Sequence, residues 1–71
     1  MNELWMDLGY GFLYFNTDKT NLYDALGEFI DKMDSIGCDY DNFGWHQIEL
    51  RDENGDSIEY FGTGDLKDIG Y

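Results

Sequence analysis

Most of the side chains in this chain that could take part in binding or catalysis are carboxylates. Its 71 residues include 16 Asp and Glu against 4 Lys and Arg, which gives a formal net charge of −12. Asp24, Glu28 and Asp31 follow one another at helical spacing. At about 100° per residue, they fall within about 60° of one another on one side of a helix. A row of this kind attracts guanidinium and ammonium groups, so the first expectation is a basic partner.

A solvated helix face is the plain alternative for this row, named here the helix stripe (Asp24, Glu28 and Asp31). Like charges three or four residues apart on a helix cost a few tenths of a kcal/mol per pair, about as much as opposite charges would contribute. Lys32 alone is too few to balance the three acids. We therefore interpret the helix stripe as a surface kept acidic for contact.

Other arrangements of acids give weaker signals. The segment Asp39-Tyr40-Asp41-Asn42-Phe43-Gly44 begins like a calcium-binding loop. The match fails at Phe43, where a ligand belongs, and at Leu50, where the loop requires a bidentate Glu. The sequence favours an acidic turn there. Weak, unselective binding of divalent ions at the acidic segment 52–56 stays open, and we expect no specific metal site.

Catalytic chemistry has little support. His46 and Cys38 are the only residues of their kinds, which excludes an internal disulfide and a cysteine-based zinc site. His46 has no nucleophile motif near it, and acidic neighbours of Cys38 disfavour a reactive thiolate. We expect no enzymatic activity and no cofactor.

The helix that must carry the stripe is predicted from about Asn21 to Ile36. Thr20 or Asn21 can cap its start, and Gly37 can take the left-handed position after its end. Its predicted apolar face consists of Leu22, Ala25, Leu26, Phe29, Ile30, Met33 and Ile36.

A hairpin is predicted from Trp45 to Asp52 and from Ser57 to Phe61. A two-residue turn at Asn54-Gly55 would pair Leu50 with Glu59 and Ile48 with Phe61. A three-residue loop with a left-handed Gly55 pairs the apolar positions instead, Leu50 with Ile58 and Ile48 with Tyr60. We expect this second register, which places Glu49 opposite Glu59 on the outer face of the sheet.

The N-terminal segment 4–15 is extended and aromatic, with Gly9 and Gly11 in its middle. It is either one kinked strand or a hairpin with arms 5–8 and 12–15, and we favour the hairpin. The predicted fold is α+β, a small antiparallel sheet with one amphipathic helix packed on one face. Residues 1–71 form a single domain, of which 62–71 is a short turn or a less ordered tail.

The aromatic residues are more numerous than one sheltered face needs. The simplest core set is Trp5, Phe12, Phe15, Phe29, Trp45 and Phe61. Tyrosines suit half-buried contact surfaces, and the notable ones here are Tyr10, Tyr14, Tyr23, Tyr40 and Tyr71. The residues expected to bind a partner are Asp24, Glu28, Asp31, Asp39, Asp41, Glu49, Glu59, Tyr23 and Tyr40.

The composition favours function through binding. In size, acidity and lack of catalytic residues, the chain resembles the small anti-defence proteins of bacteriophages and mobile elements, including anti-CRISPR proteins and anti-restriction DNA mimics. The resemblance is one of composition along the whole chain, so no functional residue is carried over. It implies an inhibitor whose carboxylates replace phosphates on the basic nucleic-acid-binding surface of a host defence protein, such as a CRISPR effector or nuclease.

Two alternatives stay open. The chain could be an acidic adaptor or immunity-type protein that binds a basic partner outside any nucleic-acid site, or an accessory domain that binds nothing through its charge. Direct binding of nucleic acid or of an anionic membrane is disfavoured by the negative charge. The N-terminus lacks the basic and apolar regions of an export signal, so we expect a cytoplasmic protein of a bacterial host.

Added salt is predicted to stabilise the fold. Screening weakens the repulsion among the uncompensated charges of a chain with net charge −12. The melting temperature measured by circular dichroism should therefore rise between low and high NaCl. A falling melting temperature would contradict this expectation.

Overall fold

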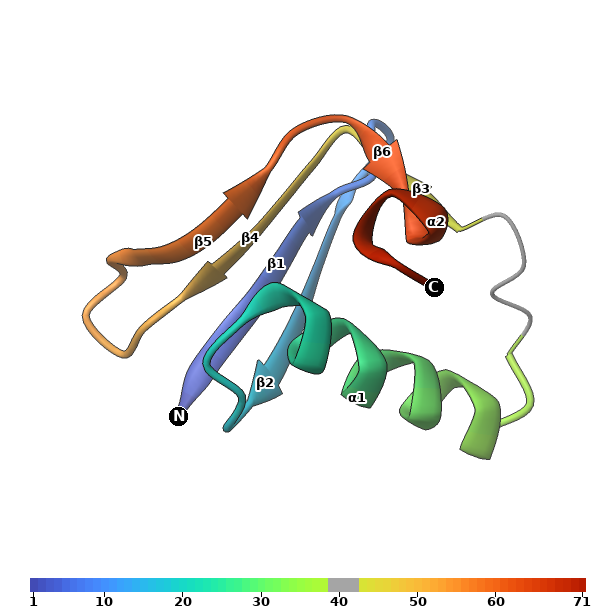
Figure 1. Cartoon of the computed structure of the whole chain (residues 1–71), viewed down its shortest axis with the longest axis horizontal. Helices are drawn as coiled ribbons and strands as arrows, with labels where there is room; N and C mark the ends of the chain where they lie inside the picture. Colours follow the sequence, from blue (N-terminus) through green and yellow to red (C-terminus); the bar gives the residue numbers. More distant parts are fainter. Residues whose placement is uncertain (39–42) are drawn as a thin grey trace.

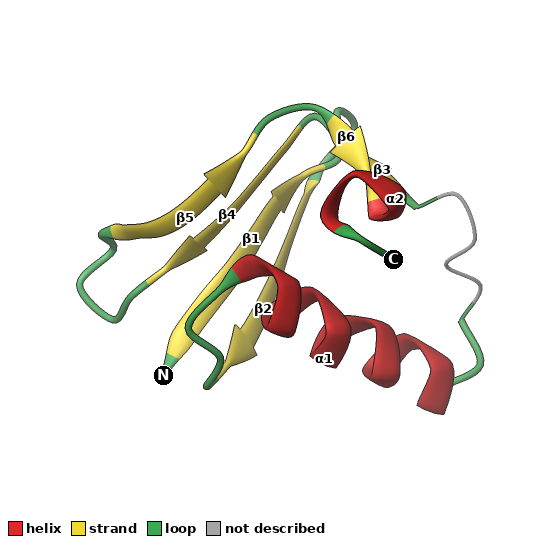
Figure 2. Cartoon of the chain, viewed as in Figure 1, coloured by secondary structure: helices red, strands yellow, loops and turns green. Residues whose placement is uncertain are grey.

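The computed structural model describes residues 1–38 and 43–71. Its main sheet is antiparallel, in the order β2-β1-β4-β5, with α1 along one face (Figures 1 and 2). The predicted α+β class is confirmed. The elements of this layer pair are β1 (Asn2–Asp7), β2 (Phe12–Thr17), α1 (Leu22–Ser35), β4 (Gln47–Arg51) and β5 (Ser57–Phe61).

A smaller unit lies beside this layer pair. It consists of β3 (Gly44–Trp45), which pairs with β6 (Gly64–Asp65), and of the short helix α2 (Leu66–Ile69). The Asp65 side chain accepts hydrogen bonds from the N–H groups of Lys67 and Asp68, and the Asp68 side chain in turn accepts one from the Asp65 N–H. This capping box begins α2, so residues 62–71 form a strand and a helical turn.

The predicted N-terminal hairpin is confirmed. Its strands β1 and β2 pair from Asn2 opposite Thr17 to Asp7 opposite Phe12. Gly9 has φ +87° in the turn, and a Cβ there would come within 2.7 Å of the His46 ring. The turn therefore requires glycine for both its backbone conformation and its packing.

The predicted helix is also confirmed. The Asn21 side chain caps its start by accepting the Asp24 N–H at 2.8 Å. Gly37 ends it with φ +74°, and the Cys38 N–H reaches the Met33 carbonyl at 2.9 Å. Ile36 departs from the prediction. It is the non-helical cap residue, so it leaves the apolar face and is 66% exposed.

The core lies between α1 and the inner face of the sheet. It takes alternate residues from the two central strands, because successive strand side chains point to opposite faces. The buried set in this layer is Leu4 and Met6 of β1, Ile48 and Leu50 of β4, and Leu22, Ala25, Leu26 and Phe29 of α1. Each such large apolar side chain contributes about 1.5–3 kcal/mol through burial.

The second hairpin has the predicted loop and a different register. Gly55 is left-handed at φ +85°, the Asp52 N–H donates to the Asp56 carbonyl at 2.9 Å, and Arg51 pairs with Ser57. The ladder then shifts, which leaves Ile58 as an extra residue in β5. This is a β-bulge beyond the loop.

The bulge reverses the predicted faces of β5. Leu50 now pairs with Glu59, Glu49 with Tyr60, and Ile48 with Phe61. The expected Glu49–Glu59 pair on the outer face is therefore wrong. Beyond the bulge, away from the loop, the hairpin therefore has the register that the sequence disfavoured.

The physical reason for this register lies at the start of α1. The first N–H groups of a helix have no partner within the helix. In the observed register Glu59 turns toward the helix, and its Oε1 accepts the Leu22 N–H at 2.9 Å. A carboxylate at this end also interacts favourably with the helix dipole. Phe61 at the same time packs against the core.

None of the helices in the described part of the chain has the length and apolar character needed to cross a bilayer.

Replacing Glu59 should destabilise the fold through α1. Glu59→Ala removes the acceptor of the Leu22 N–H and should lower the free energy of unfolding by about 1 kcal/mol. Glu59→Gln keeps an acceptor oxygen and should lose less. Urea unfolding of both variants measures the difference. Equal stabilities for the alanine and wild-type proteins would contradict this role of Glu59.

Candidate functional site

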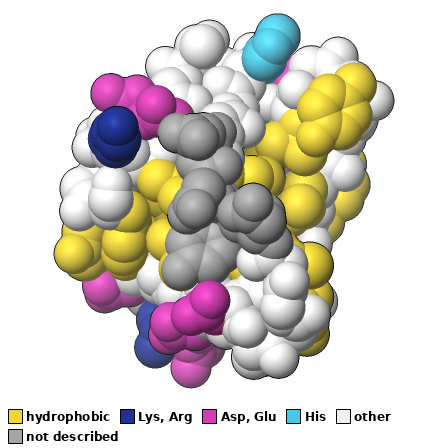
Figure 3. Space-filling view, turned by 90° about the vertical axis from the view of Figure 1, so that its right-hand side faces the viewer, with side chains coloured by type: hydrophobic (Ala, Val, Ile, Leu, Met, Phe, Trp, Pro, Cys, Tyr) yellow, Lys and Arg dark blue, Asp and Glu magenta, His cyan; other side chains and the backbone are white. Residues whose placement is uncertain are grey.

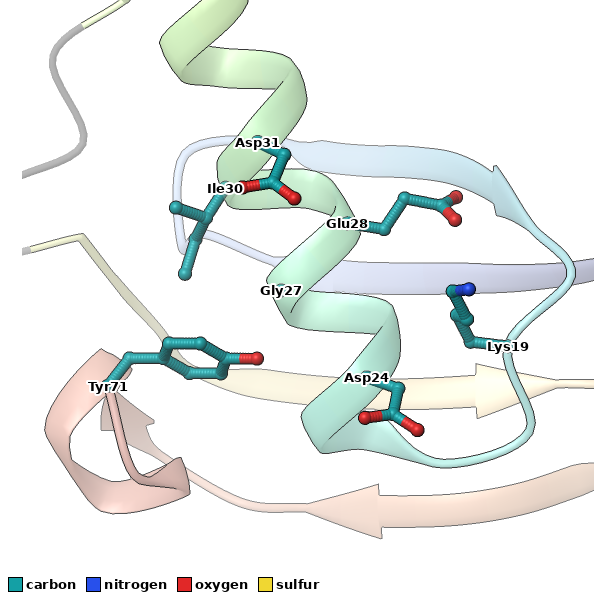
Figure 4. Close-up of a pocket in the computed structure, with 7 residues that line it drawn as sticks. All are labelled: Lys19, Asp24, Gly27, Glu28, Ile30, Asp31 and Tyr71. Atoms are coloured by element: carbon teal, nitrogen blue, oxygen red, sulfur yellow. The ribbon is translucent and has the colours of Figure 1, made fainter.

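The helix stripe lines an open groove on the exposed side of α1. The groove has a volume of about 570 Å³ and is bordered by Lys19 at one side and Tyr71 at another. Figure 4 shows the side chains of Asp24, Glu28 and Asp31 projecting from successive turns of α1. The predicted grouping of these three acids on one helix side is therefore present in the structure.

The stripe has no cationic partner within the described residues. Their ion pairs join Met1 to Glu53, Lys19 to Asp18, and Arg51 to Glu49. Asp24 accepts one neutral hydrogen bond, from Asn21 Nδ2 at 2.9 Å. The carboxylates of the stripe therefore keep most of their capacity to accept hydrogen bonds from a ligand.

A second, smaller groove lies between α1 and β2. It has a volume of about 280 Å³. Glu28 and Asp31 line both grooves, so these two carboxylates lie between them. The other lining residues are Phe15 and Asn16 of β2, and Lys32 and Ser35 of α1.

Glu49 lies apart from the stripe. Ile48 and Leu50 on either side of it are buried toward α1, so Glu49 points to the opposite face of the sheet. There it forms an ion pair with Arg51. The hydrogen bond from Arg51, with a smaller contribution from Ser57, lowers the pKa of the Glu49 carboxyl. Glu49 thus stays ionised, and its charge is compensated by Arg51.

The five acids expected on α1 and the outer sheet do not form one band. Glu49 is on the outer face, and Glu59 is bonded to the backbone at the start of α1. Figure 3 shows one face of the molecule, and on the described part of that face the acidic side chains gather in separate groups among hydrophobic ones. Neither Glu49 nor Glu59 therefore extends the helix stripe as a free carboxylate.

The outer face of the sheet carries aromatic rings. Trp5 and Phe12, both expected in the core, lie there and stack with ring centroids 5.3 Å apart. The register explains this, because Leu4 and Met6 take the buried positions on either side of Trp5. The Arg51 guanidinium lies 4.6 Å from the centre of the Trp5 ring, a cation–π contact.

Tyr23 contacts the C-terminus of the chain. It is 51% exposed and stacks on Tyr71 at 4.7 Å, while the Tyr71 hydroxyl donates to the Tyr23 carbonyl at 2.7 Å. The position of Tyr71 at the border of the groove is not predicted by the sequence pattern. The available signal was Gly27 within an otherwise regular helix, because a Cβ at Gly27 would collide with the Tyr71 hydroxyl.

Three expected partner-binding residues, Asp39, Tyr40 and Asp41, lie outside the described residues, as does the start of the calcium-like segment. Within residues 1–38 and 43–71, no three His, Cys, Asp or Glu side chains are grouped so that they could hold a metal ion.

No protein-family model matches the chain, and neither a curated protein nor a solved structure is found to be similar to it. The function must therefore be inferred from the geometry of the chain itself.

The contact between Tyr71 and α1 should give the fold an alkaline transition. Burial, followed by the charges of Tyr23 and Asp24, raises the pKa of the Tyr71 hydroxyl. A raised pKa means that the protonated form is favoured in the folded state, so this stabilisation is present below about pH 10 and is lost as the pH rises through the folded value.

Tyr71→Phe tests this directly. It should cost about 1 kcal/mol or less at neutral pH, because a hydrogen bond is lost, and should flatten the fall in stability above pH 10. Tyr10→Phe is the matched control, since Tyr10 is 90% exposed. Urea unfolding between pH 7 and pH 11 gives the comparison. An alkaline fall in Tyr71→Phe equal to that of the wild type would refute the assignment.

Proposed function

We propose that this protein is a non-catalytic acidic inhibitor that uses α1 to occupy the basic nucleic-acid-binding surface of a partner, in the manner of an anti-CRISPR or anti-restriction protein. The observation that carries the proposal is the helix stripe: Asp24, Glu28 and Asp31 share one side of α1 and have no ion pair within the described residues. These carboxylates are accessible acceptors for arginine and lysine side chains.

The spacing of the stripe supports phosphate mimicry. An α-helix rises about 1.5 Å per residue, so the three carboxylates span about 10.5 Å along α1. A single DNA strand carries one phosphate per about 3.4 Å. The stripe thus has a linear charge density of the same order as one nucleic-acid strand. A groove built to bind phosphates offers complementary donors.

The net charge supports the same proposal through association kinetics. A chain with net charge −12 is attracted to a basic groove from a distance, which raises the rate of encounter and makes it sensitive to salt. Arg51 is held by Glu49 on the opposite face of the sheet, away from the stripe. It therefore does not oppose approach along α1.

A second candidate is an acidic adaptor or immunity-type protein that binds outside a nucleic-acid site. The observation that favours it is that neither Glu49 nor Glu59 extends the stripe as a free carboxylate, because Arg51 pairs with Glu49 and Glu59 accepts the Leu22 N–H. The three carboxylates of the helix stripe cover a shorter length than the phosphates of a duplex bound in a nucleic-acid groove would. Competition with nucleic acid distinguishes the two candidates, because an adaptor leaves the partner's nucleic-acid site open.

The test is affinity capture from a bacterial lysate at low salt, followed by measurement of binding to the identified partner. The stripe variant is Asp24→Asn, Glu28→Gln and Asp31→Asn. The control, Glu3→Gln, Glu53→Gln and Asp56→Asn, changes the net charge equally, on β1 and in the loop between β4 and β5, and removes the exposed ion pair of Glu53 with the N-terminus. We expect the stripe variant to lose at least tenfold in affinity and the control to lose less than threefold.

Competitor DNA or RNA should release the partner from the wild-type protein. Release by nucleic acid together with loss in the stripe variant supports mimicry. A partner that binds the stripe variant as tightly as the control variant would overturn the assignment of α1, and a partner indifferent to nucleic acid would favour the adaptor.

A further inference from the structure

The free edge of β2 lacks the features that usually protect an edge strand. β2 is the outermost strand in the order β2-β1-β4-β5, so within the described residues no strand pairs with its outer side. Its sequence, Phe-Leu-Tyr-Phe-Asn-Thr, contains no charge, proline or glycine. Proteins commonly block such edges with charged residues, proline or bulges.

The opposite edge of the sheet shows the contrast. β5 carries the bulge at Ile58 and the charged Glu59. β2 pairs with β1 over six consecutive residue pairs without a register shift. One edge of this small sheet is therefore interrupted, and the other is regular and open to pairing.

The outward backbone groups of β2 can be assigned. The Leu8 N–H donates to the Gly11 carbonyl at 2.8 Å, which marks the innermost hydrogen-bonded pair of the hairpin. Hydrogen-bonded and non-hydrogen-bonded pairs alternate in an antiparallel ladder. The N–H and C=O groups of Phe12, Tyr14 and Asn16 consequently point away from β1, toward the free edge.

The surroundings of this edge differ on its two faces. On the α1 side, the groove between β2 and α1 presents two carboxylates, Glu28 and Asp31, and one ammonium group, that of Lys32. On the outer face, Phe12 and Tyr14 are 60% and 59% exposed. A strand added here would place alternate side chains on these two faces, one set beside carboxylates and the other beside aromatic rings.

We propose that β2 receives an extended, arginine- or lysine-bearing segment of the partner protein as a fifth strand. Its main chain pairs with Phe12, Tyr14 and Asn16, and its basic side chains on the α1 side contact Glu28 and Asp31. This inference rests on the proposed function, because it takes the partner to be basic. A second copy of the chain is the less favourable occupant, since two molecules of net charge −12 repel each other.

The probe is an end-blocked octapeptide of alternating arginine and threonine. The controls are two versions of the same peptide, one N-methylated on its odd residues and the other on its even residues. Both keep the charge, and each lacks half of the main-chain donors. Binding to the full chain is measured by calorimetry at low salt. We expect the parent peptide to bind and at least one N-methylated form to bind tenfold more weakly or worse.

Protein variants test the same main-chain pairing by changing β2 instead of the peptide. Tyr14→Pro removes an outward N–H, whereas Tyr14→Val removes the ring and keeps that donor. We expect Tyr14→Pro to bind the parent peptide at least tenfold more weakly than Tyr14→Val. If circular dichroism shows that Tyr14→Pro does not fold, the comparison of the peptides on the wild-type protein still tests the main-chain pairing.

Three results would overturn the proposal. The first is no binding of the parent peptide, and the second is equal binding of the parent and both N-methylated peptides. The third is a self-association, seen by analytical ultracentrifugation, that Tyr14→Pro abolishes and Tyr14→Val preserves, which would assign the edge to a second copy. In the second case, weaker binding by the stripe variant would show that α1 binds basic ligands without strand addition, and the proposed function would stand.

Discussion

The extra residue in β5 is the constraint on which the rest of this structure depends. Without Ile58 out of register, Glu59 would lie beside Glu49 on the outer face, where like charges repel. With it, Glu59 bonds the Leu22 N–H at the start of α1, and Phe61 joins the core. One bulge thus joins the second hairpin to the helix and divides the acidic residues between the two faces of the sheet.

This division determines which charges remain accessible. Glu49 is held by Arg51, and Glu59 serves the backbone of α1. The helix stripe is left on the solvent side of α1, between the C-terminal Tyr71 and the open edge of β2. In a chain with so few cations, three neighbouring acids without an ion pair in the described part of the chain form a surface suited to a basic ligand. The placement of that surface beside a regular strand edge adds main-chain pairing to charge as a means of recognition.

Local signals were sufficient for much of the fold. The caps at Asn21 and Gly37, the apolar period of α1 and the turn glycines Gly9 and Gly55 each act within a few residues. The helix, the N-terminal hairpin and the loop at Gly55 are confirmed, whereas Ile36 leaves the apolar face and the register beyond the loop differs. The grouping of the helix stripe follows from the same period. These features depend on backbone geometry that the sequence encodes nearby.

The remaining features depend on distant partners. The register of β5 depends on the Leu22 N–H, which has no acceptor within α1 and is 37 residues from its acceptor Glu59. The alternation that buries Leu4 and Met6 turns Trp5 outward, although composition suggested a core residue. Gly27 is explained by the contact between Tyr71 and α1, which is seen only in the folded structure. Each of these is a tertiary effect that local propensity does not contain.

The most direct measurement is amide hydrogen exchange, residue by residue by NMR, on the free protein and on its complex with the captured basic partner. The outward N–H groups of Phe12, Tyr14 and Asn16 should exchange rapidly in the free chain and slowly in the complex, and the resonances of Glu28 and Asp31 should shift. Protection confined to the hairpin tip at 52–56, with β2 and α1 unchanged, would contradict the assignment of this surface.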